Sequence, residues 1–114
     1  MQPPFEISAA ALQRLTSAAT VPNQEIGIGR DLSFRLLSPE GELTDAFEGE
    51  HYSISHDTRN AWSERRAEQF SIAGREFWVP PDAIEHLKGK TLTLIRRYEG
   101  PKQRGKVQSV LIAS

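Results

Sequence analysis

The sequence predicts an α+β fold: an N-terminal helix, then a mostly antiparallel β-sheet forming a small sandwich or roll, with a short helix inserted between strands. Three observations lead to this class. Near the N-terminus, Leu12, Leu15 and Ala19 recur at helical spacing. From residue 32 onward, apolar and polar residues alternate, which is typical of strands. Further on, Pro81 opens a short helical pattern between two alternating stretches. The 114 residues suffice for one domain, spanning 1–114, and are too few for two.

The first element is a helix predicted over residues 8–19. The Ser8 hydroxyl suits an N-cap, because it accepts a hydrogen bond from an amide of the first turn. Five alanines in this range favour the helix, and Phe5 and Ile7 precede it as a short extended segment. Pro22 ends it. The glycines of Gly27-Ile28-Gly29 are interpreted as a bend before the first long strand.

The middle of the chain predicts short strands and a charged helix. Leu32 to Leu36 alternate as a strand, and Ser38-Pro39-Glu40-Gly41 has the composition of a β-turn. A weaker strand over 43–47 and another over 51–55 follow. Asp57 or Thr58 is expected to cap a helix over residues 59–69.

The last third predicts a hairpin, a helix and a second hairpin. Strands over 70–72 and 77–79 flank a turn at 73–75, and a helix over 81–88 ends at Gly89 in the left-handed conformation. Strands over 92–95 and 107–112 are joined by the Gly- and Pro-containing loop 100–105.

The composition excludes several classes of protein. The chain has no cysteine, which excludes a disulfide scaffold, a thiol nucleophile and a cysteine-ligated zinc or iron–sulfur site. No apolar run approaches the roughly 20 residues of a membrane span. The start of the chain lacks the basic and apolar regions of an export signal, so a cytoplasmic protein without a membrane partner is expected.

Charge is distributed unevenly along the chain. The net charge is −1, but residues 86–114 carry +6 and residues 1–85 carry −7. Five carboxylates fall within residues 40–50. Such a polarised chain attracts an anionic partner to one end, unless the acidic segment folds against the basic one and neutralises it.

The strongest basic cluster predicts an anion-binding hairpin. It consists of Arg96, Arg97, Lys102, Arg104 and Lys106, with Tyr98 beside them. A ribbon of two strands with basic tips can follow a nucleic-acid backbone, and an aromatic ring can stack on a base. The sequence pI of about 6.3 argues against this, since nucleic-acid modules are usually basic. Charged residues also protect edge strands from unwanted pairing, which is the alternative interpretation.

Trp62 is the candidate residue for a protein interface. It lies in a predicted helix that is otherwise polar, and an exposed tryptophan often anchors a protein–protein contact. The alternative is that Trp62 packs in the core. Core packing is also expected for Phe77, Trp78 and Val79, which precede the helix at 81–88.

No residue pattern predicts a catalytic, cofactor-binding or metal site. His51 and His56 are separated by an odd number of residues, so on one strand they face opposite sides. A dyad of either histidine with Asp57 is the remaining enzymatic alternative. The consecutive order Ser55-His56-Asp57 cannot form the hydrogen-bonded row of a catalytic triad.

Two stretches resemble a known family. Residues 5–15, FEISAAALQRL, and residues 75–95, REFWVPPDAIEHLKGKTLTLI, resemble the HesB-like, A-type iron–sulfur carrier domain. The resemblance implies a small β-rich fold with the first helix packed on the sheet. The ligands of that family are cysteines, which this chain lacks, so no functional residue is carried over and the chemistry of the cluster is expected to be lost.

These observations favour a small non-enzymatic binding or accessory domain without a cofactor, whose partner is a protein. Nucleic acid or another polyanion bound by the basic hairpin is the alternative. The sequence leaves the oligomeric state open.

Overall fold

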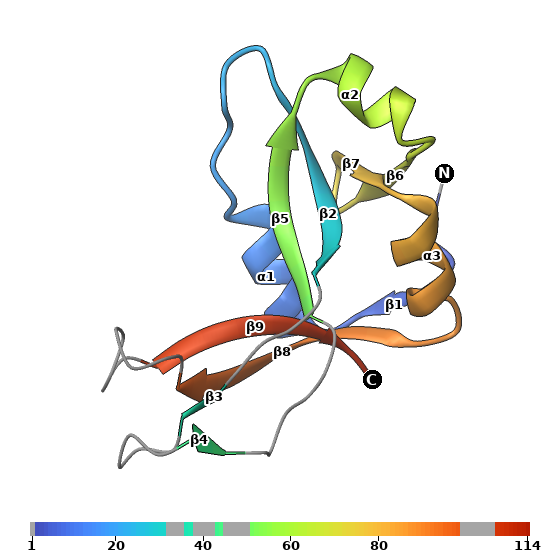
Figure 1. The fold of residues 1–114 in the computed structure, drawn as a ribbon. Coiled ribbons are helices and arrows are strands. Elements are labelled where there is room, and N and C mark those ends of the chain that lie inside the picture. The colour runs from blue at the N-terminus through green and yellow to red at the C-terminus, as the bar shows by residue number, and fades with distance from the viewer. Residues whose placement is uncertain (1, 32–35, 38–42, 45–50, 99–106) are drawn as a thin grey trace.

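The computed structural model describes the backbone of residues 2–31, 36–37, 43–44, 51–98 and 107–114, and the side chains of 2–30, 51–94 and 110–114. Strands and helices together confirm the α+β class (Figure 1). In chain order the elements are β1 (Glu6–Ile7), α1 (Ala9–Thr16), β2 (Glu25–Asp31), β3 (Leu36–Leu37), β4 (Leu43–Thr44), β5 (His51–Asp57), α2 (Arg59–Glu64), β6 (Glu68–Ile72), β7 (Arg75–Val79), α3 (Pro81–Leu87), β8 (Thr91–Tyr98) and β9 (Val107–Ala113).

Seven of the strands form one mixed sheet in the order β1-β8-β9-β5-β2-β7-β6, and β3 pairs with β4 separately. Four of the pairings in the large sheet are antiparallel, while β1–β8 and β2–β7 are parallel. The sheet curves into a half-barrel, so that β8 and β9 run across the lower ends of β5 and β2 (Figure 1). The described strands therefore form a curved sheet, and the expected sandwich or roll is not shown.

The helices begin at capping residues that are visible in the sequence. The Ser8 hydroxyl accepts a hydrogen bond from the amide of Ala11 at 3.2 Å, and Thr58 does the same for Ala61 at the start of α2. Both helices are shorter than predicted. Within the expected 59–69, α2 ends at Glu64, because Arg66 adopts a positive φ of 58° that a helix cannot continue through. After α3, Gly89 has the expected left-handed conformation, with φ at 73°.

The interpretation of Gly27-Ile28-Gly29 as a bend is wrong. These residues lie within β2, which pairs with β5 along its whole length and with β7 at Gly27. The missing side chain at Gly27 leaves room for a tryptophan ring, as described below. The strand predicted over Leu32 to Leu36 and the turn over 38–41 lie largely outside the described residues; β3 and β4 are the described part of this region.

The two predicted hairpins are present. β6 and β7 pair antiparallel around Ala73 and Gly74, whose φ angles of 51° and 78° are those of a two-residue turn matching the twist of the strands. β8 and β9 pair antiparallel from Leu92 to Tyr98. No helix within the described residues has the length and apolar character to cross a membrane.

One face of the sheet carries the hydrophobic core, together with α1 and α3. Its buried members come from six strands, two helices and the segment before β1: Phe5, Ala11, Leu15, Ile26, Ile28, Tyr52, Phe70, Ile72, Phe77, Val79, Ala83, Leu87, Leu92 and Leu111. Side chains alternate along a strand, so Gly27 and Trp78, which lie between core residues, face the opposite side. We call this opposite side the outer face. α2 packs on it.

Candidate functional site

On the outer face, Glu25 connects α2 to the sheet. Its backbone carbonyl accepts a hydrogen bond from Trp62 Nε1 at 2.9 Å. Its carboxylate accepts hydrogen bonds from Trp78 Nε1 at 3.2 Å and from Arg59 Nε at 3.1 Å. The side-chain amide nitrogen of Gln69, Nε2, lies 3.5 Å from the same carboxylate. These bonds satisfy both indole N–H groups of the protein and fix α2 in place, which is a structural role.

The structure favours the packing alternative for Trp62 over the interface. The side chain is fully buried, at 0% exposure, although it lies on the predicted polar helix. It lies over Gly27, where an added Cβ would come within 2.6 Å of two ring carbons. The Arg65 guanidinium lies 5.0 Å from the ring centre and covers it further. The ring therefore offers no surface to a protein partner.

The histidines and Asp57 do not form a dyad in the structure. Both His51 and His56 lie on β5 at an odd separation, as predicted. His56 Nε2 donates to the carbonyl of Ala19 at 2.7 Å, and the Asp57 carboxylate pairs with Arg65 at 2.8 Å. Among the described side chains, no three histidine or carboxylate groups come close enough together to bind a metal ion.

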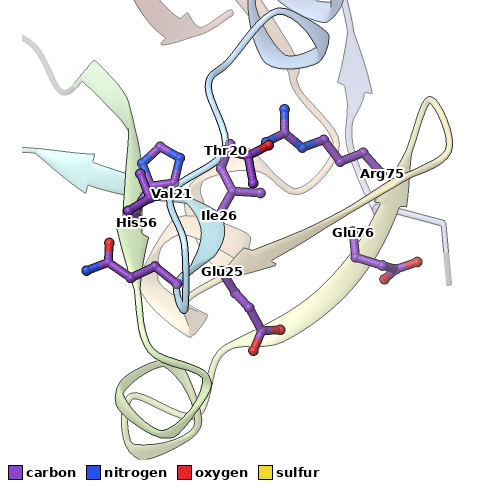
Figure 2. A pocket seen from close by; sticks show the side chains of 8 residues that line it. Thr20, Val21, Glu25, Ile26, His56, Arg75 and Glu76 are labelled. Atoms are coloured by element: carbon purple, nitrogen blue, oxygen red, sulfur yellow. The ribbon is translucent and has the colours of Figure 1, made fainter.

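A hollow of about 230 Å³ lies between the end of α1 and strands β2, β5 and β7 (Figure 2). Two of its polar lining residues, Arg75 and His56, form hydrogen bonds to the segment that follows α1. Arg75 Nη1 donates to the carbonyl oxygen of Ala18 at 2.7 Å, and Arg75 Nη2 donates to the carbonyl oxygen of Ala19 at 3.4 Å. Ala18 and Ala19 directly follow Ser17, the C-cap of α1, so Arg75 and His56 connect the segment after α1 to the sheet.

Tyr52 carries a buried hydroxyl that has no hydrogen-bond partner among the described residues. The residue is 3% exposed, and it lies on β5 directly opposite Arg30 of β2. Burial raises the pKa of the phenol above its ordinary value of 10.0; Arg30 opposes this shift and Asp82 adds to it. A buried polar group without a partner costs stability, which makes Tyr52 a site for mutational tests.

Strand β6 forms one of the two edges of the sheet, and the two-residue strand β1 forms the other. β6 is the last strand in the sheet order and pairs only with β7 among the described residues. In a hairpin closed by a two-residue turn, the pair next to the turn, Ile72 and Arg75, is hydrogen-bonded, and every second pair follows it. The amide and carbonyl groups of Gln69 and Ser71 therefore point away from β7. These four backbone groups are available to an added strand.

The surroundings of β6 distinguish this edge from a protected one. Proteins usually blunt a free edge with charged residues, proline or a bulge, and residues 68–72, EQFSI, contain no proline and one charged residue, Glu68 at the start of the strand. The core-facing Phe70 is sealed by the ring of Phe5, with centroids 6.5 Å apart at 71°. Beside the first residue of β6, a groove of about 320 Å³ separates the strand from α3. It is lined by Arg66, Glu68, Pro81, Ile84, Glu85 and Lys88.

The predicted basic cluster is only partly described. Arg96 and Arg97 belong to β8, opposite Ser109 and Gln108 of β9. Lys102, Arg104 and Lys106 lie outside the described residues, as do all five carboxylates of the acidic segment at 40–50. Anion binding by this cluster therefore stays a prediction.

Comparison with known proteins adds no further constraint: no family model matches the chain, and no curated protein or solved structure was found to be significantly similar to it. The resemblance to the HesB-like domain stays a prediction.

Sequence reasoning missed Glu25, Gln69 and Ser71. The alternation of Phe70 and Ile72 and the turn at 73–75 predicted the hairpin itself. Whether β6 lies at an edge or inside a sheet depends on pairings between residues distant in sequence, for which the sequence carries no local signal.

Proposed function

We propose that this protein is a non-enzymatic binding domain whose protein partner adds an extended strand to the free edge of β6. The observation that supports the proposal is the outward direction of the backbone groups of Gln69 and Ser71. Addition of a strand to an exposed sheet edge is a common mode of peptide recognition. The main-chain hydrogen bonds supply affinity, and the side chains on either face supply specificity.

The expected affinity is modest. Each backbone hydrogen bond contributes a net of about 0.5–1.5 kcal/mol, and the edge offers four backbone groups. Ordering the added strand opposes this gain. A dissociation constant of tens of micromolar or weaker follows, because four such bonds supply at most about 6 kcal/mol, and this suits a transient accessory role.

The proposal is compatible with a HesB-like scaffold that lacks its cysteines, because a scaffold without cluster chemistry can still contribute contacts. It also agrees with the engagement of His56 and Asp57 in structural bonds.

A displayed library of random peptides of about ten residues tests the proposal, since a strand of this length spans the edge. Peptides are selected on the wild-type protein and then titrated against Ser71→Pro and Ser71→Thr. Ser71→Pro removes an outward amide and leaves the ladder to β7 intact, because proline is tolerated at a sheet edge. Ser71→Thr is the matched control, since it changes the side chain and keeps the amide.

We expect selected peptides to lose at least about tenfold in affinity on Ser71→Pro and less than about twofold on Ser71→Thr, as one or two hydrogen bonds are lost. Amide resonances of Gln69 and Ser71 should shift on binding. Recovery of no binding peptide, or of peptides that bind both variants equally, would contradict the proposal. Circular dichroism of each variant checks that the fold is retained.

A second candidate is binding of a polyanion by Arg96, Arg97, Lys102, Arg104 and Lys106. The pairing of β8 with β9 supports it, because this places the first two residues on the expected ribbon. Fluorescence anisotropy with labelled single- and double-stranded oligonucleotides at about 50 and 200 mM salt tests it, since phosphate contacts weaken steeply with salt. Binding that collapses at the higher salt and disappears in a variant with Arg96, Arg97 and Arg104 replaced by alanine is expected. Flat traces at both salts refute it.

A further inference from the structure

We infer that the strand that docks on β6 belongs to a second copy of this chain, so that two β6 strands pair antiparallel across a two-fold axis and join the two sheets. This inference rests on the proposed function and specifies its partner. It predicts a homodimer with one continuous sheet.

The hydrogen-bonding pattern determines the register. In antiparallel pairing the residues whose backbone groups point outward must lie opposite one another. Gln69 and Ser71 are the two outward-pointing residues of β6. An axis through Phe70 therefore places Gln69 opposite the partner's Ser71 and Ser71 opposite the partner's Gln69. All four outward groups of each chain are then bonded.

Charge is compatible with this register. β6 has one ionisable residue, Glu68, and the axis through Phe70 places it opposite the partner's Ile72, so that no like charges oppose each other. The groove beside β6 contains two basic and two acidic residues and carries no net charge. The whole chain carries only −1, so long-range repulsion between two copies is small.

The same register also brings the turn of each copy close to the groove of the other. Extended beyond the strand, it places the partner's turn at Ala73 and Gly74 beside Ala67 and Arg66, at the mouth of the groove between β6 and α3. Both turn residues are exposed, and nothing in the described part of the chain lies within 4 Å of a Cβ placed on Gly74. The turn is thus small enough to approach the groove, and each copy supplies one turn and one groove.

Sedimentation equilibrium between about 5 and 500 µM tests the association, because a dimer of micromolar affinity dissociates across this range. For the wild type and Ser71→Thr we expect a mass that rises with concentration toward twice 12.8 kDa. For Ser71→Pro we expect the dimer dissociation constant to rise at least about tenfold. The circular dichroism spectrum of this variant should match that of the wild type.

Cross-linking tests the register in chains that keep every backbone amide. The protein has no cysteine, so Gln69→Cys and Ser71→Cys introduce single thiols. Residues directly opposite in the proposed dimer lie about 5.5 Å apart at Cα, within disulfide range, whereas identical residues lie on the longer diagonal. Oxidation of an equal mixture should therefore yield the mixed 69–71 disulfide in much more than the roughly twofold excess over either homodimer that random pairing gives. Ser63→Cys, on the exposed surface of α2, is the control for random collision.

The outcomes separate this inference from the function it rests on. A wild-type chain that stays monomeric to about 500 µM overturns the inference, and if selected peptides still depend on the Ser71 amide, the proposed function stands. A dimer that Ser71→Pro leaves intact, or statistical cross-linking, overturns pairing through β6. Failure of both self-association and peptide binding overturns both proposals.

Discussion

Replacement of Gly27 by alanine tests how the outer face is assembled. A Cβ at this position would lie 2.6 Å from two ring carbons of Trp62 and 2.6 Å from the backbone carbonyl oxygen of Trp78. Contacts this short do not occur in relaxed structures, so the neighbours must move. Trp62 is fully buried, at 0% exposure, so its ring has no adjacent free space to enter.

The expected loss in the free energy of unfolding is the sum of the overpacking cost and the lost hydrogen bond of Trp62. Overpacking a close-packed site costs about 1–3 kcal/mol. If the ring is displaced, the hydrogen bond from Trp62 Nε1 to Glu25 is lost as well, at about 1 kcal/mol. We expect Gly27→Ala to lower the free energy of unfolding by about 3 kcal/mol, a large part of the roughly 5–15 kcal/mol typical of a domain.

Gly29→Ala is the matched control on the same face of the same strand. Its Cβ would make only ordinary contacts, 3.7 Å from the Ser55 hydroxyl and 4.0 Å from that of Ser53. It should leave the stability unchanged or raise it by up to about 1 kcal/mol, because alanine restricts the unfolded chain.

Urea denaturation followed by tryptophan fluorescence and by circular dichroism measures both variants. Trp62→Phe removes part of the ring that meets the new Cβ, so the double variant should recover about 1 kcal/mol in a double-mutant cycle. If the free energies of unfolding of Gly27→Ala and Gly29→Ala differ by less than about 0.5 kcal/mol, the close packing of Trp62 on β2 is refuted.

Four further predictions concern three side chains. Tyr52→Phe should raise the free energy of unfolding by about 1 kcal/mol, because the buried hydroxyl has no described partner; a measured loss of stability would show that it has one. The raised pKa of Tyr52 means that the folded state holds the phenolic proton more tightly, so stability should be lost as pH rises above 10.0, and Tyr52→Phe should reduce this loss in melting curves recorded against pH. Glu25→Gln should cost about 1 kcal/mol in urea denaturation, since the bonds from Arg59 and Trp78 lose their charged acceptor at a half-exposed site; an unchanged midpoint would contradict this. Arg75→Ala should cost about 1–2 kcal/mol and accelerate amide exchange at the end of α1, because the carbonyl of Ala18 loses its donor; exchange unchanged from the wild type would argue against this junction.

The local elements of this protein follow from short-range chemistry. Ser8 and Thr58 cap helices because their hydroxyls accept hydrogen bonds from the backbone amides three residues further on. These amides are close to the hydroxyls along the chain, so the caps do not depend on tertiary structure. The turn at 73–75 and the left-handed Gly89 are equally local, because they depend on the conformational freedom of one or two residues. Alternation likewise predicted that Phe70 and Ile72 of β6 are buried.

Apart from the lengths of α1 and α2, the failures of sequence reasoning are non-local. The sequence predicts a bend at Gly27 because glycine is rare inside strands. The position of Gly27 within β2 is explained only by the packing of Trp62, which lies 35 residues further along the chain. For Trp62 the sequence left an exposed position and core packing both open, because its own helix is polar, and the sheet beneath that helix supplies its burial. Composition and periodicity thus determined the class, the caps and the hairpins of this protein. Tertiary structure alone decided the strand order, and with it the free edge of β6, because neighbours in a sheet are selected by long-range packing.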